Sequence, residues 1–441
     1  MSAAGTQQKV IPNEVAMQQA WRFRLWGAGR IKTTQGINIQ ILDPGIYNTG
    51  SGPDFKDARV RVGDELWVGS VEIHRKASDW YRHGHDRDEA YRNVVLHIVG
   101  EDDCRIDRED RSEVLQAVME ISPGFENMFN GLMSSPRLVL PMCGNSIRDV
   151  ESIFRVDWIT ALAFERLIRK ADDVAKLLEM NNGNWIEVSY IMLARGLGLG
   201  ANADNMERLA RSLPFRYLLR HSDSQDTVEG LLFGRAGLLN AENPADYHEA
   251  DLLREFNFYF HKYHLPPISR PIWHLSARNV ANTPYRRIAL LSTLICKHGA
   301  DIAHVLCELC DTEAIKKFLE VDIPEYWRYS YSFGREVKTR MSALGKQSFD
   351  LLIINVLAPL VYCRGLKTGN VALLDGAMQL WMQTAGERNN ITYGFEKFGI
   401  ESNDAFTSQA LIQLHREYCE RRRCTECRIG HKLLSSYIKM G

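Results

Sequence analysis

The sequence predicts an α+β protein in which a mixed β-sheet with flanking helices is followed by a larger, mainly α-helical domain. Short segments whose apolar and polar residues alternate, as in half-buried strands, fall within the first 121 residues. From about residue 150 onward, apolar residues recur three and four positions apart, as in amphipathic helices. We therefore expect a sheet domain over residues 1–130, a linker over 131–150 and a helical domain over 151–441.

The amino-acid composition is that of a soluble globular protein. The chain has 441 residues, enough for two or more domains, and its 45% hydrophobic and 25% charged residues are ordinary for a soluble globular protein. The net charge of −1 excludes a global basic field, so any contact with nucleic acid must come from a local patch. No signal-peptide pattern opens the sequence, and the longest apolar run, 351–362, contains Pro359. Because the nine cysteines are scattered, we expect a cytoplasmic protein with reduced thiols and no membrane contact.

Local signals place the elements around the sheet. Asn13 is a candidate N-cap for a helix over 14–26, which a Gly-x-Gly stretch at 27–29 would end. Residues 93–99 are apolar on both faces except at His97, which is typical of a central strand. Further strands are expected over residues 37–42 and 114–121. Helices are expected over residues 159–178, 185–195, 206–219, 229–239, 284–298, 301–320, 346–363 and 371–385.

A β-hairpin is predicted between these strands. Residues 58–62 alternate as Ala-Arg-Val-Arg-Val, which is typical of a half-buried strand. Gly63-Asp64 is a turn signal, and it leads to a second strand that begins near Leu66.

Groups that bind metals or move protons gather on this hairpin. On the second strand Glu72, His74 and Lys76 share one face, because side chains alternate between the two faces of a strand. Asp54 lies at the mouth of the hairpin, near Glu72 in the expected pairing. Two carboxylates at a strand edge are a candidate Mg²⁺ site, since Mg²⁺ takes oxygen ligands and is often held by one or two carboxylates. The alternative is a solvated strand face beside a turn.

The Pro-Asp pair that ends at Asp54 and the Glu72-x-His74 triplet resemble the PD-(D/E)xK nuclease superfamily. The resemblance implies a restriction-endonuclease-like fold in which Asp54 and Glu72 bind Mg²⁺ and the ion assists cleavage of a phosphodiester bond. His74 stands where the superfamily has lysine, so His74 or Lys76 would position the attacking water. The resemblance also implies that Glu14, on the first helix, points at the site.

Two functions fit this pattern. One is a Mg²⁺-dependent nuclease whose helical domain grips the nucleic acid or a partner. The other is a non-catalytic nucleic-acid-binding or scaffold protein that keeps a degenerate nuclease fold. The retention of Asp54 and Glu72 favours the enzyme, whereas His74 in place of lysine favours the second function. The sequence gives neither the substrate preference nor the oligomeric state.

The segment after the hairpin carries more histidines. The run from His83 to Asp88, His-Gly-His-Asp-Arg-Asp, resembles the His-x-His-x-Asp-His run of metallo-β-lactamase hydrolases but lacks its last histidine. A zinc hydrolase is therefore a further alternative, beside a polar loop at a helix start and beside contacts of His83 and His85 with phosphate. Trp80 is a candidate for stacking on a base, although aromatic residues at this density are more often core.

The C-terminal region contains a second candidate metal site. Cys419, Cys424, Cys427 and His431 offer three sulfurs and one imidazole within 13 residues, which suits tetrahedral Zn²⁺. His415 is a substitute ligand. We predict a structural Zn²⁺ here, and the alternative is a set of free cysteines at a basic helix end.

The most basic short segment of the chain lies among these cysteines. Arg421, Arg422 and Arg423 are candidate contacts to phosphate, which would release counterions from a nucleic acid. The alternative is that this run of charge is a solvated face.

Across most of its length the chain resembles a family of uncharacterised bacterial proteins described only as a domain of unknown function. The segments that carry the resemblance are GPDF at 52–55, VEIH at 71–74, SDW at 78–80, HGH at 83–85 and LGKQSFDLLIINVLAPL at 344–360. The resemblance extends from about Glu14 to the C-terminus. It implies no activity, so the nuclease prediction depends on the hairpin motif.

Overall fold

The computed structural model describes residues 12–26, 31–108, 113–134, 141, 143–265, 273–275, 282–338, 340 and 344–439. The chain divides into two compact units: the first is Met1–Trp158, Gly394–Ile400 and Leu414–Gly441, and the second is Ile159–Tyr393 and Glu401–Gln413. The predicted α+β order, a mixed sheet followed by many helices, is confirmed. The sequence predicts that residues 151–441 form one helical domain. In this division, residues 414–441 belong instead to the first unit.

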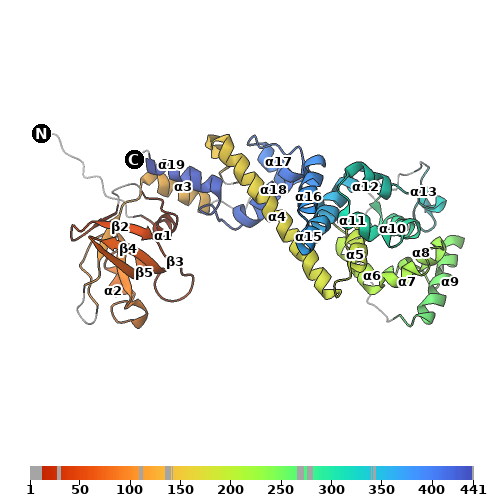
Figure 1. Ribbon diagram of the computed structural model, residues 1–441, viewed down its shortest axis with the longest axis horizontal. Helices are drawn as coiled ribbons and strands as arrows, with labels where there is room; N and C mark the ends of the chain where they lie inside the picture. The colour runs from red at the N-terminus through yellow and green to blue at the C-terminus, as the bar shows by residue number, and fades with distance from the viewer. Residues whose placement is uncertain are drawn as a thin grey trace. The chain divides into compact units, whose positions relative to one another are not determined.

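A seven-stranded mixed sheet lies in the first unit (Figure 1). Its strands are β1 (Ile31–Thr33), β2 (Ile39–Asp43), β3 (Ile46–Tyr47), β4 (Phe55–Val62), β5 (Glu65–Lys76), β6 (Val94–Glu101) and β7 (Gln116–Met119). The strand order is β1-β7-β6-β5-β4-β2, and β3 pairs with β4. β4 and β5 form the predicted hairpin, whose last pair is Phe55 with Val71, while β5, β6 and β7 run parallel.

Helices cover both faces of this sheet. They are α1 (Glu14–Arg22), α2 (Asp79–Arg82), α3 (Pro123–Ser134) and α19 (Arg428–Lys439), with 3₁₀ turns at Glu89–Tyr91 and Gly144–Asp149. On one face Trp21 of α1, Phe125 of α3 and Leu434 of α19 share a core with the strands. α19 packs beside α3 although the two helices are far apart in the sequence (Figure 1). On the other face Trp80 and Tyr91 form a second core.

The first helix begins as predicted and ends earlier. The Asn13 side chain accepts a hydrogen bond from the Val15 N–H and caps α1. α1 ends at Arg22, because Arg24 adopts a left-handed backbone (φ 54°) that an α-helix does not continue through. The predicted glycine stop at 27–29 lies outside the described residues.

The second unit is helical. Its helices, with those that join it to the first unit, are α4 (Ser152–Met180), α5 (Trp185–Leu197), α6 (Ala203–Ser212), α7 (Phe215–Leu219), α8 (Gln225–Ala236), α9 (Tyr247–Lys262), α10 (Pro284–His298), α11 (Asp301–Glu308), α12 (Thr312–Leu319), α13 (Glu325–Tyr329), α14 (Lys346–Leu352), α15 (Ala358–Thr368), α16 (Val371–Gln383), α17 (Asn390–Glu396) and α18 (Ala405–Gln413). π-helical turns at Ile353–Leu357 and Leu414–Cys419 follow α14 and α18, and β8 (Ser330–Ser332) pairs with β9 (Arg335–Glu336).

One helical segment is long and apolar enough to cross a membrane. It runs from Lys346 to Thr368, and 67% of its apolar window is buried inside the protein. A π-helical turn precedes Pro359, which lacks the N–H that a regular helix would use, so the segment continues through it. This degree of burial is typical of a core helix in a soluble protein, and it is the only such segment among the described residues.

Candidate functional site

The structure brings the two predicted carboxylates together. The Asp54 backbone N–H donates to Glu72 Oε2 over 3.0 Å. Asp54 itself accepts two hydrogen bonds, from Gln18 Nε2 at 2.9 Å and from the Ile73 N–H at 3.0 Å. Both carboxylates are thus held in fixed positions at the point where the hairpin pairing ends.

The open edge of β5 explains why carboxylates lie here. Beyond its last pair with β4, this edge of β5 presents backbone N–H groups that still need acceptors. Asp54 accepts from Ile73, and Glu14 accepts from the Arg75 N–H. Glu14 of α1 therefore lies on the same edge of β5 as Asp54, and burial followed by nearby carboxylates such as Glu72 raises its pKa.

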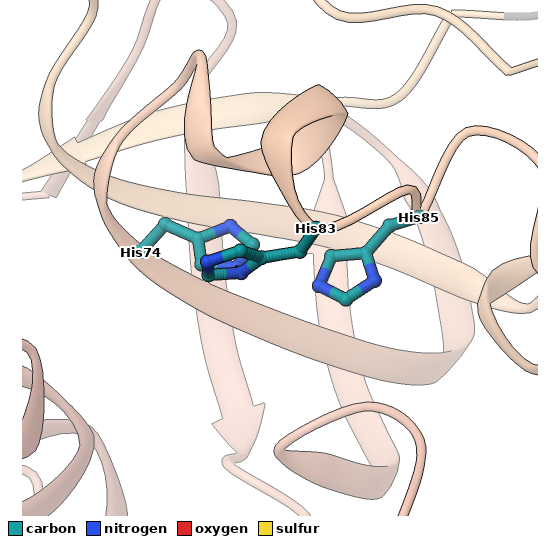
Figure 2. Close-up of side chains that lie close together, drawn as sticks. All are labelled: His74, His83 and His85. Carbon is teal, nitrogen blue, oxygen red and sulfur yellow. The ribbon is translucent and has the colours of Figure 1, made fainter.

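Three histidines, His74, His83 and His85, converge in one place (Figure 2), and Glu72 lies beside two of them. One ring nitrogen from each of His74, His83 and His85 lies within 4.8 Å of the others. His74 Nε2 is 3.2 Å from His83 Nδ1, and Glu72 Oε1 is 3.4 Å from the Nε2 atoms of both His74 and His85. His74 is buried while His83 is exposed, so the group opens to solvent on one side. Three imidazoles beside a carboxylate suit a first-row divalent metal ion.

The loop after α2 delivers the second and third histidines. Asp79, at the start of α2, accepts a hydrogen bond from the Lys76 N–H at 3.3 Å and so fixes the helix against the end of β5. Gly84 adopts a left-handed backbone (φ 76°), which gives the sharp turn between His83 and His85. Trp80 is fully buried, with its ring 5.5 Å from that of His85. Trp80 therefore supports the histidine and is not placed to stack on a base.

A chain of polar side chains behind the site fixes the protonation of His74. The Gln116 amide donates to Asp102 Oδ1 at 2.6 Å and to the Cys104 carbonyl at 3.3 Å, so its oxygen faces His97 Nδ1 at 3.2 Å. His97 Nδ1 must then donate, and its Nε2 accepts from His74 Nδ1 over 2.9 Å. His74 Nε2 is consequently unprotonated, with a lone pair directed toward His83 and Glu72. This is the arrangement by which outer groups orient a metal-binding histidine.

Burial sets the charges of the site. It lowers the pKa of His74 to about 2, with help from the nearby imidazoles, and that of His97 to about 4. Both rings are therefore neutral at physiological pH. Burial, followed by the charge of Glu72, raises the pKa of Asp54 to about 7. The Asp54 carboxyl is therefore unusually costly to ionise in the protein without an ion. A bound cation would favour its ionised form.

Lys76 is not part of this group. Its ammonium lies 3.0 Å from Glu101 Oε2 on β6, and 43% of its side chain is exposed. Lys76 lies on the same face of β5 as His74 by strand alternation. Its register partner on β6 is Glu101, however, and the ammonium pairs with that carboxylate and not with the group around the histidines.

Two of the three C-terminal arginines pair with glutamates of their own segment. Arg421 pairs with Glu417 at 2.9 Å, and Arg423 pairs with Glu426 at 2.5 Å and lies over the Tyr418 ring. Arg422 has partners as well. Cys419, Cys424 and Cys427 line one small cavity of the first unit, whereas the His431 ring is not among its lining residues.

Sequence reasoning missed three residues of the site. His97 was visible as the single polar interruption of an apolar strand, which is a usable signal for a buried polar contact. Gln116 and Gln18 carried no such signal, because a glutamine at the end of a strand or on an amphipathic helix is ordinary.

The fold and site thus define an α+β protein with a histidine and carboxylate cluster where the pairing of β4 with β5 ends, and with a second, helical unit. The chain belongs to the family described as protein of unknown function (DUF2851), whose model matches residues 14–390. This confirms the predicted resemblance to a domain of unknown function. No curated protein and no solved structure matches the chain.

Proposed function

We propose that the protein is a metal-dependent hydrolase that cleaves phosphodiester bonds in nucleic acid. The observation that carries the proposal is the convergence of His74, His83 and His85 on one side of the Asp54 and Glu72 pair. Metal-ligating nitrogens, a fixed carboxylate and access to solvent are together what a hydrolytic metal centre requires.

The ligand chemistry favours an ion softer than the Mg²⁺ suggested by the sequence motif. Imidazole suits Zn²⁺ and similar first-row ions, whereas Mg²⁺ prefers oxygen ligands and water. His74, His83 and His85 would hold the ion, with Glu72 adjacent. When bound, it would polarise a phosphate oxygen and lower the pKa of a water molecule.

The carboxyl of Asp54 suits proton transfer in such a site. Without an ion its pKa is about 7, near the pH at which a general acid or base works best, and a bound cation would lower that pKa. Two hydrogen bonds hold the carboxyl in place. What favours phosphodiester chemistry over other hydrolysis is the resemblance of the motif to the PD-(D/E)xK superfamily. Asp54 lies directly before β4, and Glu72 and His74 lie in β5.

A panel of labelled single- and double-stranded DNA and RNA, incubated with Mg²⁺, Mn²⁺ or Zn²⁺, tests the proposal. We expect cleavage that depends on added metal and is lost in His83→Ala. His83 is exposed, so its removal should spare the fold. No cleavage of any substrate with any ion would count against hydrolysis of nucleic acid.

The second candidate is a protein that binds nucleic acid without cutting it. The position of Lys76 favours this candidate, because its ammonium pairs with Glu101 and supplies no positive charge beside Glu72. Stable binding of nucleic acid without cleavage in the same panel would support it.

The C-terminal arginines should contribute little to either function. We expect the triple variant Arg421→Ala, Arg422→Ala, Arg423→Ala to bind nucleic acid like the wild type, because ion pairs with Glu417 and Glu426 already compensate two of these charges. The measurement is the slope of the logarithm of affinity against the logarithm of salt concentration. Three lost phosphate contacts would flatten that slope by about three units, and such a change would contradict the expectation.

A further inference from the structure

Four cysteines from two distant segments line one cavity of the first unit. Cys143, directly before the 3₁₀ turn at Gly144–Asp149, meets Cys419, Cys424 and Cys427 around a space of about 20 Å³. The rest of the lining is mostly apolar. Cys427 is buried and the other three are partly buried, and all four are free thiols. Four cysteines on one small cavity are more than packing needs, because apolar side chains would fill such a space at lower cost.

The backbone around Cys427 is arranged to stabilise a negatively charged sulfur. The N–H groups of Ile429 and Gly430, in the first turn of α19, donate hydrogen bonds to the Cys427 sulfur. A Cβ at Gly430 would overlap the Cys424 carbonyl, so the turn between the two cysteines can approach α19 only because this residue is glycine. Donors directed at one sulfur of a Cys-x-x-Cys pair are useful for a thiolate and unnecessary for a buried thiol.

We propose that Cys143, Cys419, Cys424 and Cys427 bind one structural Zn²⁺. Four thiolates are a usual ligand set for this ion in closed structural sites, and each thiol releases its proton to solvent as it binds. The spacing Cys-x4-Cys-x2-Cys with a distant fourth cysteine also occurs around iron–sulfur clusters, and the metal analysis described below distinguishes such a cluster from Zn²⁺.

Cys143 takes the place that sequence spacing assigns to His431. The His431 ring packs edge-on against Phe23, with centroids 6.2 Å apart, and lies outside the lining of the cavity. A sequence cannot show this exchange, because Cys143 lies hundreds of residues before the other three cysteines.

The ion would tie the C-terminal segment to the sheet unit and to α1. Between the cysteines, Thr425 donates to Gln19 at 3.0 Å and Glu426 accepts from Arg22 at 3.4 Å. Both partners lie on α1, the helix whose Gln18 holds Asp54. Zinc binding at the cysteines would therefore stabilise the position of α1 beside the histidine site without taking part in any reaction there.

The test compares Cys143→Ser with His431→Ala in full-length protein that also carries His83→Ala and His85→Ala, so that the histidine site does not bind metal. Zinc is measured by elemental analysis. After replacement by Co²⁺, thiolate ligands are measured by their charge-transfer absorption in the near ultraviolet, which imidazole does not give. We expect about one ion per chain in the parent and in His431→Ala, and loss of both signals in Cys143→Ser.

A second measurement, the intensity of the cobalt–thiolate absorption, uses the parent protein alone. It therefore remains informative if the Cys143→Ser variant does not fold. The intensity of the cobalt–thiolate absorption in the parent protein rises with the number of sulfurs bound, and we expect the intensity of four. An intensity for three thiolates together with loss of metal in His431→Ala would overturn the proposal in favour of a Cys3His site. Iron with acid-labile sulfide in the purified protein, or four thiols that react freely with no metal present, would also overturn it. Each of these results is independent of whether the protein cleaves nucleic acid.

Discussion

Glu72→Gln should reduce metal-dependent cleavage by roughly a hundredfold or more while leaving the fold intact. Glu72 Oε1 lies 3.4 Å from ring nitrogens of both His74 and His85, so its charge acts where the ion would bind. A glutamine of the same shape can still accept the hydrogen bond from the Asp54 N–H through its amide oxygen. We therefore expect a melting temperature within about 2 °C of the wild type. The measurements are the cleavage rate on the best substrate of the panel and a thermal denaturation curve.

Lys76→Met is the matched control for this experiment. This substitution also removes a charge from β5, but the ammonium of Lys76 pairs with Glu101 at the surface, where ion pairs contribute little to stability. We expect the Lys76 variant to cleave at the wild-type rate. If Lys76→Met lost activity while Glu72→Gln kept it, the catalytic group would lie elsewhere than at the three histidines.

The core of the site could be predicted because it depends on local geometry. A two-residue turn at Gly63 and the alternation of β5 are enough to place Asp54 beside Glu72 and to put His74 on the same face. The helix start at Asn13 is equally local, and the hydrogen bond from the Val15 N–H to the Asn13 side chain confirms it. Such features follow from turn chemistry and period-two alternation, which act over a few residues.

The rest of the site depends on pairings that link distant parts of the chain. Parallel pairing of β5 with β6 places His97 beside His74, and β6 with β7 places Gln116 behind both. Neither partner can be identified without the strand order. The same limit explains Cys143, which reaches the C-terminal cysteines only because residues 414–441 return to the first unit. The sequence pattern also placed Lys76 at the site, since alternation does not reveal that Glu101 lies next to it.

The clearest effect on stability should come from Asp54→Asn, which we expect to stabilise the metal-depleted protein above pH 7. Burial and then the charge of Glu72 raise the pKa of Asp54 from its usual 3.8 to about 7. Below about pH 3.8 the carboxyl is protonated in both the folded and the unfolded chain. As pH rises from 3.8 to 7 the unfolded chain releases this proton while the folded chain keeps it, so the free energy of unfolding falls. Above 7 both forms are ionised and the loss is complete.

The size of this loss follows from the pKa change. Each pH unit corresponds to about 1.4 kcal/mol, so a change from 3.8 to about 7 sets an upper bound of roughly 4 kcal/mol, and we expect about half of that bound. Asparagine does not titrate and can still accept from the Ile73 N–H. The Gln18 amide can rotate to accept from the new amide group, so the hydrogen bonds of the carboxyl are largely replaced.

The measurement is the difference in the free energy of unfolding between Asp54→Asn and wild type, taken from urea denaturation between pH 5 and pH 8. Both proteins are depleted of metal in the same way, so that contributions of the cysteines and histidines cancel in the difference. We expect the difference to grow in favour of the asparagine variant with rising pH and to level off above pH 7. A difference that stays constant over this range would mean that Asp54 ionises at its ordinary pKa. The same variant should lose metal-dependent cleavage, because an amide cannot take up or release the proton that we propose Asp54 transfers.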